Sequence, residues 1–485
     1  MAMIIGREKE RAELLRLYEE KKPEFVAVFG RRRVGKTYLI DQTFGDKIVF
    51  RHAGLSPVEL QKLPAKRRVE QQLLAFQISL INQGYEDAPL PKDWMHAFLL
   101  LEKFLEKIDN DKRLLVFLDE LPWLDTDGSL FIAALEFFWN SWACHQDRLM
   151  LIVAGSATSW MENELIHNKG GLYGRVTYQI RLKPFTLHEC EEYYQYRKIE
   201  MSRYDATVCY TTLGGIPYYL NYLNPALSLP QNIDKIFFAD TAPLKGEFDL
   251  LFSSIFTNPE RMKSIVTALN QKSVGLTRME LAAKLHLSSG GSLSKDLLSL
   301  LESGFVMKYV PFLGNKRQEY YKLIDPFCLF WLRFLADKRS GEGNFFATHF
   351  DSPAFSAWRG LAFENICFYH IPQIKNTLSI GGVSLQASPY FQKGDGKNQG
   401  LQIDLVLDRN DNVINLCEAK FTSLPFEIDK DYHSSLVSRK EAIQANVSPK
   451  KSVSNVLITT FGLKKNIYSS DFTNVITLDD LFSKS

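Results

Sequence analysis

The chain lacks the features that mark membrane, zinc-binding and disulfide-rich proteins. Its 485 residues include only six cysteines, at scattered positions and with no Cys-x-x-Cys pair. Structural zinc and a disulfide framework are therefore not expected. No uninterrupted apolar run reaches the length of a membrane span, and the N-terminus lacks the apolar stretch of a signal peptide. By elimination we expect a cytoplasmic protein without a membrane partner.

A strong excess of charge of either sign is also missing. The net charge is +2, so any surface for nucleic acid must be local. Hydrophobic residues make up 45% of the chain, which is enough for several cores, and charged residues make up 24%. At about 150 residues per domain, this length predicts about three domains.

The most informative segment is an octapeptide near the N-terminus. It consists of Gly30, Arg31, Arg32, Arg33, Val34, Gly35, Lys36 and Thr37. An apolar run precedes it and a helical pattern follows, which is the context of a phosphate-binding P-loop. There the backbone N–H groups and the helix N-terminus face phosphate, while Lys36 reaches the β- and γ-phosphates and Thr37 binds Mg²⁺. The segment predicts a nucleoside triphosphate site. Because the loop backbone faces the phosphate, we expect the three arginines to pack or form salt bridges rather than bind DNA.

A second acidic motif follows the apolar run 113–118. Asp119 is expected to hold Mg²⁺, usually through water, and Glu120 to polarise the water that attacks the γ-phosphate. Capping of the next helix is the alternative role for the two carboxylates. Further strands are expected at 47–52, 149–154 and 176–182, separated by helices, so the sheet should be parallel and covered on both faces.

An extra strand between the P-loop strand and the Asp-Glu strand indicates the P-loop division that carries a catalytic glutamate. Ser156, at the tip of its strand, is either a sensor of the γ-phosphate or simply a small residue that begins a turn.

Five ordered motifs together resemble the archaeal-type AAA+ ATPases, which are related to the STAND NTPases. They are the P-loop, Leu-Asp-Glu-Leu-Pro-Trp-Leu from 118, Ala-Gly-Ser from 154, Gly-Leu-Tyr-Gly-Arg from 171, and Gly-Gly-Ile-Pro-Tyr-Tyr-Leu from 214. The resemblance implies ATP and Mg²⁺ as ligands, an ATPase core over 1–185 and a helical lid over 186–240. It also implies a finger-like or sensor role for Arg175 and contact of Pro217 with the nucleotide. An exposed loop arginine and a turn that opens a helix are the alternatives.

The segment 241–336 is predicted to be a winged helix-turn-helix. Between 259 and 322 we count ten Lys or Arg residues against five Asp or Glu. Helical patterns at 261–269, 279–285 and 292–302 precede a hairpin formed by 305–310 and 319–323. Such domains often place a helix in the DNA major groove. The candidate phosphate contacts are Lys295, Lys308, Lys316 and Arg317. Internal packing with a solvated basic face remains the alternative.

A polar, Gly-rich linker over 337–344 leads to a C-terminal domain, 345–485. Strand 401–407 carries Asp404, and the return strand carries Glu418 and Lys420, which share one face because they are two residues apart. Folding the hairpin brings Asp404 opposite or diagonal to Glu418. This Asp…Glu-x-Lys pattern resembles the restriction-endonuclease-like family, in which the carboxylates hold Mg²⁺ and the lysine acts on the attacking water. Glu364 matches the acidic helix residue that often lies upstream.

A cross-strand surface charge cluster is the alternative for these residues, because the C-terminal segment has fourteen basic and fourteen acidic residues and no broad basic field. The sequence as a whole predicts an α/β protein in which a P-loop parallel-sheet domain with a helical lid precedes a winged helix and an α/β nuclease-like domain. Its nucleotide state is expected to control a nuclease acting on DNA. A regulatory switch with an inactive nuclease fold, or a scaffold that forms a homo-oligomer on ATP binding, are the alternatives.

Overall fold

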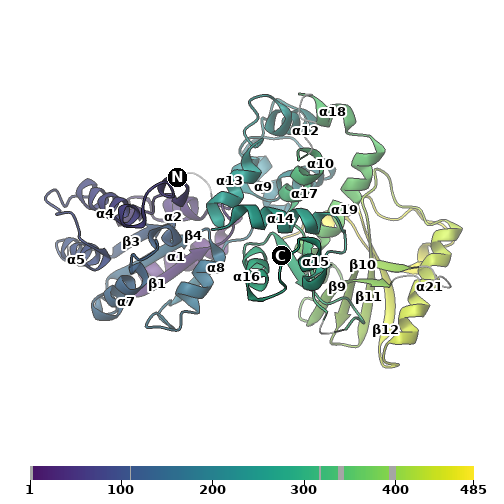
Figure 1. The fold of residues 1–485 in the computed structure, drawn as a ribbon. Helices are drawn as coiled ribbons and strands as arrows, with labels where there is room; N and C mark the ends of the chain where they lie inside the picture. Colours follow the sequence, from purple (N-terminus) through teal and green to yellow (C-terminus); the bar gives the residue numbers. More distant parts are fainter. Residues whose placement is uncertain (1–3, 110, 316–317, 337–342, 393–399, 485) are drawn as a thin grey trace. The chain divides into compact units, whose positions relative to one another are not determined.

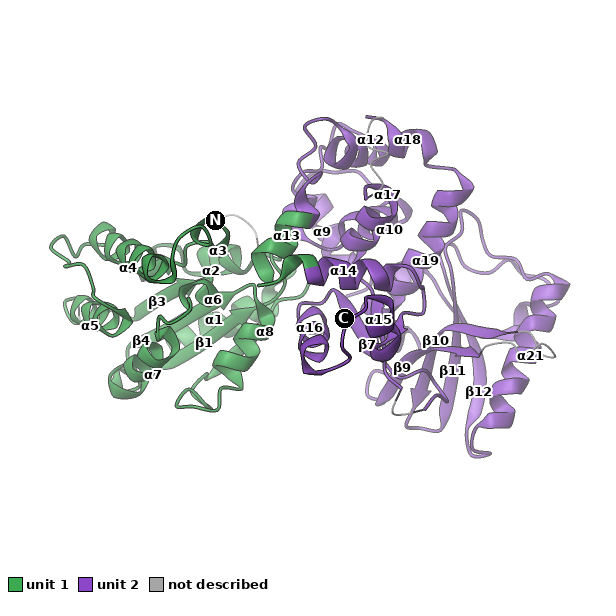
Figure 2. Cartoon of the chain, viewed as in Figure 1, with its two compact units in different colours: residues 1–184, 249–260 green, residues 185–248, 261–485 purple. Residues whose placement is uncertain are grey.

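The computed structural model describes residues 4–109, 111–315, 318–336, 343–392 and 400–484 (Figure 1). The chain forms two compact units, shown in Figure 2. Unit 1 contains residues 1–184 and 249–260, and unit 2 contains residues 185–248 and 261–485. Most of the linker expected at 337–344 lies outside the described residues. No helix in the described ranges is both long and apolar enough to cross a membrane.

Unit 1 is built on a five-stranded sheet in which every neighbouring pair is parallel. The strand order is β2-β3-β4-β1-β5. The strands are β1 (Glu24–Phe29), β2 (Ile48–Ala53), β3 (Leu114–Asp119), β4 (Leu149–Gly155) and β5 (Tyr178–Arg181). All five expected strands are therefore confirmed. The strand that separates β1 from β3 in the sheet is β4, whereas β2, which lies between them in the sequence, is at the edge.

Helices cover both faces of this sheet, as the continuous apolar runs in its strands predict. Every residue of β1, β3 and β4 is buried, which is typical of parallel strands between two helical layers. One large apolar cluster joins alternate residues of these strands to helices α4, α5 and α7. The described unit 1 helices of two or more turns are α1 (Glu8–Glu19), α2 (Lys36–Phe44), α4 (Ala65–Asn82), α5 (Trp94–Leu105), α7 (Phe131–Ser141) and α13 (Glu247–Ile255), of which α13 begins in unit 2.

The first part of unit 2 is helical and includes α9 (Leu187–Tyr196), α10 (Arg203–Leu213), α11 (Pro217–Leu220) and α12 (Leu229–Ile233). The chain then forms a small antiparallel sheet with the order β6-β8-β7. Its elements are α14 (Pro259–Asn270), β6 (Leu276–Thr277), α15 (Arg278–Lys284), α16 (Gly291–Glu302), β7 (Val306–Tyr309) and β8 (Tyr320–Leu323). Helix α17 (Pro326–Phe334) follows and packs against α10.

The C-terminal part of unit 2 is a mixed five-stranded sheet with the order β13-β12-β11-β10-β9. The strands are β9 (Leu385–Gln392), β10 (Leu401–Arg409), β11 (Val413–Lys420), β12 (Ser452–Thr459) and β13 (Phe472–Ile476). The hairpin β10–β11 is antiparallel, whereas β11–β12 and β12–β13 are parallel. Helix α19 (Pro353–Tyr369) contacts β10 and β11, and α21 (Lys430–Asn446) contacts β12 (Figure 1).

Candidate functional site

At two positions, the loop between β1 and α2 has a backbone conformation that residues other than glycine rarely adopt. Gly35 has φ 95° and forms the N-cap of α2, so the helix N-terminus opens directly onto the loop. Gly30 has φ 148°, and a Cβ there would lie 2.2 Å from the Leu182 carbonyl oxygen of the chain leaving β5. Backbone geometry thus accounts for the two motif glycines, and a loop of N–H groups at a helix N-terminus is an arrangement that suits an anion.

Lys36 is joined to the acidic motif by a chain of hydrogen bonds. Its Nζ donates to the Ser156 hydroxyl at 3.0 Å, and that hydroxyl donates to Glu120 Oε1 at 2.7 Å. The Ser156 N–H donates to the other Glu120 carboxylate oxygen at 3.1 Å. Glu120 has left-handed backbone angles (φ 46°, ψ 49°), which are uncommon for a residue other than glycine and cluster at functional sites. Ser156 therefore connects the P-loop lysine to the carboxylate.

Two oxygen groups beside the P-loop suit a magnesium ion. The Thr37 hydroxyl donates to Asp119 Oδ2 at 2.7 Å, so a hydroxyl and a carboxylate oxygen already lie side by side. Mg²⁺ in nucleotide sites is commonly held by such a pair together with phosphate oxygens. Burial raises the pKa of Asp119 and lowers the pKa of Lys36. A cation beside Asp119 and phosphate beside Lys36 would both favour the charged forms that burial opposes.

The three arginines of the loop and the more distant motif residues have different surroundings. The Arg32 guanidinium lies 5.3 Å from the centre of the Trp123 ring, and Arg31 is buried.

Arg175 is exposed on the turn before β5. Pro217 begins α11 in unit 2, where a Cβ on the neighbouring Gly215 would lie 1.9 Å from the Phe185 carbonyl oxygen. Close chain packing thus accounts for that glycine, and the roles of Arg175 and Pro217 toward ATP stay predictions.

The acidic hairpin of unit 2 has the register that the sequence suggested. Leu405 pairs with Cys417, so the adjoining residues Asp404 and Glu418 face each other across the two strands. Asp404 Oδ2 accepts a hydrogen bond from the Ala419 N–H at 3.0 Å. Lys420 Nζ lies 3.5 Å from Glu418 Oε2. Burial and then Asp404 raise the pKa of Glu364, on α19, to about 7.

Both oxygens of the Glu418 carboxylate accept hydrogen bonds from neighbouring side chains. One oxygen accepts from Arg439 Nη1 at 2.5 Å, and the other accepts from the Tyr432 hydroxyl at 2.7 Å. No three acidic, histidine or cysteine side chains among the described residues lie close enough together to hold a metal ion. The arrangement therefore does not fit a metal as it stands, because Glu418 would first have to exchange Arg439 for the ion.

The basic residues expected to meet DNA are only partly described. Lys308 is on β7 and pairs with Glu319 at 2.9 Å, and Lys295 is exposed on α16. Lys316 and Arg317, at the expected tip of the β7–β8 hairpin, lie outside the described residues. DNA contact by these four side chains stays a prediction.

Sequence reasoning missed residues that act through long-range contacts. Arg7 is buried and donates to the carbonyl oxygens of Val34 at 3.4 Å and Lys183 at 2.6 Å, which ties the N-terminal segment to the P-loop. Arg439, on α21, donates a hydrogen bond to Glu418. The polar run on α21 was the available signal, but the face that meets the sheet depends on how the helix packs.

Comparison with known proteins finds that the N-terminal part of the chain is similar to an ATPase domain. Residues 4–223 match a family model described as an ATPase domain predominantly from Archaea. An uncharacterized protein of Methanocaldococcus jannaschii is 24% identical over 433 residues, which cover 87% of this chain and 88% of the relative.

Two solved structures are also similar to this chain. The Walker-type ATPase PABY2304 of Pyrococcus abyssi has 17% identity and a TM-score of 0.47, over 68% of this chain and 96% of the other. The ORC2 protein of Aeropyrum pernix, in complexes with ADPNP and ADP, has 13% identity and a TM-score of 0.40, over 70% and 96%.

Proposed function

We propose that this protein binds and hydrolyses ATP at the P-loop of unit 1, and that the nucleotide state controls the C-terminal domain of unit 2. The observation that carries the first part is the hydrogen-bonded chain from Lys36 through Ser156 to Glu120. It supports the proposal because Lys36, as the phosphate-binding cation, and Glu120, as the general base, would act together at the ends of the neighbouring strands β1, β4 and β3. The ATPase match over residues 4–223 supports the same site.

Each side chain of this site has a distinct task in the proposal. The backbone N–H groups of the loop and Lys36 bind the β- and γ-phosphates, and Thr37 with Asp119 would hold Mg²⁺. The ion, when bound, supplies positive charge that offsets charge on the transferring phosphoryl group. Glu120 accepts a proton from the attacking water, and Ser156 holds the Glu120 carboxylate in place. The exposed Arg175 would act on the nucleotide of a neighbouring copy in a homo-oligomer.

Steady-state phosphate release by the full chain with ATP and Mg²⁺ tests this part. We expect turnover that disappears without Mg²⁺ and in a Thr37→Ala variant. Thr37→Val is the matched shape control, because valine fills the same volume without an oxygen. Turnover that is unchanged in both variants would exclude Thr37 as a ligand of the ion.

The proposed control of the C-terminal domain is supported by contacts inside unit 2. Helices α9 and α10, which form the proposed lid, pack directly on the C-terminal part of the chain. Tyr204 of α10 stacks on Phe421 with ring centres 4.8 Å apart, directly after Lys420. Arg203 pairs with Asp479 at 2.7 Å, and the Leu187 N–H donates to His370 Nε2 at 3.0 Å. A nucleotide-dependent displacement of the lid would therefore be transmitted to the strand that carries Glu418 and Lys420.

Two functions are proposed for the C-terminal domain, each with its own supporting observation. The cross-strand placement of Asp404 and Glu418, with Lys420 and Glu364, supports a Mg²⁺-dependent nuclease acting on DNA, fused to a winged helix over 241–336. The Arg439 and Tyr432 contacts to Glu418 favour the second function, an ATP-dependent regulatory switch that binds DNA or protein with an inactive nuclease fold.

Incubation of the full chain with supercoiled plasmid, Mg²⁺ or Mn²⁺, and with or without ATP, separates the two functions. Cleavage that depends on the metal and on Asp404 would support the nuclease. If no DNA form is cut under any nucleotide condition, while ATP is hydrolysed, the regulatory switch is the better account.

A further inference from the structure

A cavity of about 430 Å³ lies inside unit 2, between the small three-stranded sheet and helix α19. Such a volume is within the range of about 300–1,000 Å³ that small-molecule sites have. Its charged lining residues are Lys272, Lys322, Arg333 and Glu364, three cations against one carboxylate. The rest of the wall mixes apolar side chains, among them Leu269 and Leu361, with amides such as Asn365. We call it the Lys322 cavity.

Lys322 is the unusual member of this lining. It lies on β8, the central strand of the small sheet, and is only 7% exposed. Its ammonium group makes no hydrogen bond and no ion pair with any residue that the structure describes, and its one direct partner is the Phe368 ring, centred 5.7 Å away. Burial lowers the pKa of Lys322, while Glu364 and Asp404 oppose that shift. A buried cation without a paired carboxylate is costly, and an apolar residue would fill the same space at less cost.

The other polar groups that line the cavity differ in whether a described residue already pairs with them. Arg333 is exposed and has no ion pair within the described part of the chain. The side-chain oxygen of Asn365 is buried without a hydrogen-bond partner. Lys272, in contrast, is paired with Glu280 at 3.2 Å. Lys322 and Arg333 are therefore the two cations of this lining with unused hydrogen-bonding capacity.

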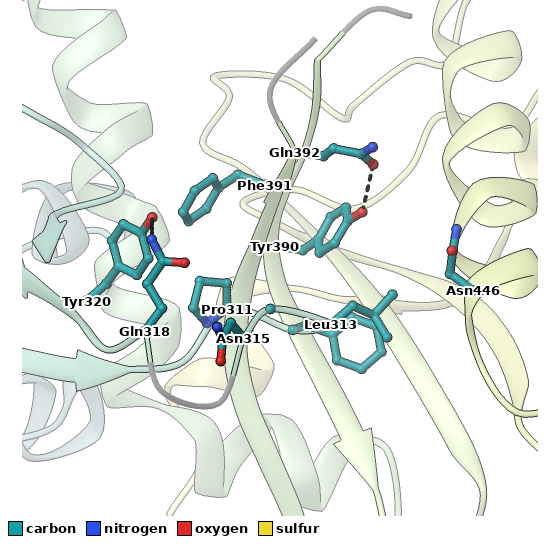
Figure 3. A pocket seen from close by; sticks show the side chains of 11 residues that line it. Pro311, Leu313, Asn315, Gln318, Tyr320, Tyr390, Phe391, Gln392 and Asn446 are labelled. Atoms are coloured by element: carbon teal, nitrogen blue, oxygen red, sulfur yellow. Dashed lines mark hydrogen bonds between the residues drawn. The ribbon is translucent and has the colours of Figure 1, made fainter. Parts of the chain in front are cut away.

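A second cavity in unit 2 provides a comparison. Its volume is about 420 Å³, and Figure 3 shows Tyr320, Tyr390 and Gln318 among the side chains around it. None of the described residues that line it carries a charge. The unpaired lysine and arginine are thus particular to the Lys322 cavity.

We propose that the Lys322 cavity binds one nucleotide of a single-stranded nucleic acid, with Lys322 and Arg333 on its phosphate. A phosphodiester accepts hydrogen bonds at several oxygens. It also carries a negative charge, which would pair with the two cations. The apolar wall formed by Leu269 and Leu361 offers a surface for a base, which a single strand can insert and an intact duplex cannot. Because Glu364 and Asp404 interact with Lys322, the bound strand would lie next to the acidic hairpin.

This inference rests on the proposed DNA partner but not on cleavage. It is tested with the full chain in EDTA, by the fluorescence anisotropy of a labelled 20-nucleotide DNA strand. We expect Lys322→Met to weaken binding by at least about tenfold, because a charged hydrogen bond in a buried place is lost. Lys465→Met, which removes an exposed lysine of unit 2 that has no assigned role in binding, should change binding by less than about twofold. The melting temperature of Lys322→Met should equal or exceed that of the wild type.

The outcomes separate this inference from the proposed function. If the wild type binds the strand and Lys322→Met binds it equally well, the cavity is not the site, although DNA remains a partner. A lower melting temperature together with unchanged binding would make Lys322 a structural residue. If thymidine 5′-monophosphate binds in a Lys322-dependent manner but the strand does not, the cavity takes a free nucleotide and the strand proposal is overturned.

Discussion

Replacement of Glu120 by glutamine is the most direct test of the ATPase mechanism. Glu120 accepts two hydrogen bonds from Ser156, one from the hydroxyl at 2.7 Å and one from the N–H at 3.1 Å. A glutamine has one oxygen, which would face the N–H, while its NH₂ group would face a hydroxyl that already accepts from Lys36. One hydrogen bond is rearranged or lost, at about 1 kcal/mol. ATP affinity should therefore change by no more than about fivefold.

Hydrolysis should respond much more strongly than binding. Glutamine cannot accept a proton, and general-base catalysis contributes about 10²- to 10⁴-fold to a rate. We expect phosphate release by Glu120→Gln to fall by at least about tenfold, while calorimetry with a non-hydrolysable ATP analogue shows near-normal binding. Glu59→Gln, at an exposed position of unit 1, is the matched control. Hydrolysis by Glu120→Gln at the wild-type rate would refute the general-base role, and a loss of binding would show that Glu120 mainly positions Lys36.

Three further predictions concern other residues. Lys36→Ala should abolish ATP binding in calorimetry, because the buried ammonium that meets the β- and γ-phosphates is lost; unchanged affinity would contradict the P-loop assignment. If the C-terminal domain is the nuclease rather than the regulatory switch, Asp404→Ala should remove Mn²⁺ binding and DNA cleavage while phosphate release persists, whereas Lys420→Ala should spare metal binding and remove cleavage alone. Burial lowers the pKa of His370 to about 4, so the unfolded chain binds more protons and unit 2 should lose up to about 3 kcal/mol of stability between pH 6.5 and pH 4. His370→Gln should reduce this acid dependence in thermal unfolding, and an unaltered pH profile would show that other groups cause it.

Much of the nucleotide site could be predicted because its chemistry is local. Binding of phosphate by successive N–H groups requires glycines at fixed spacing within a single loop, and Gly30 and Gly35 show that requirement directly. The buried apolar runs before Asp119 and Ser156 likewise predict parallel strands whose ends meet at one edge of the sheet. The position of Asp404 opposite Glu418 is also set locally. The short turn between β10 and β11 fixes the register of the two strands.

The contacts that decide what these groups can do depend on packing between distant segments. The sequence indicates a serine at a strand tip, but only the sheet order, with β4 between β1 and β3, places Ser156 between Lys36 and Glu120. The hairpin pattern suggests a metal site, yet the orientation of α21 brings Arg439 onto Glu418. In the sequence, Lys322 is one of several basic residues of the expected hairpin. Only the packing of β8 against α19 buries its charge beside Glu364. A local motif determines its own backbone, whereas the partner of a buried charge is set by the tertiary fold.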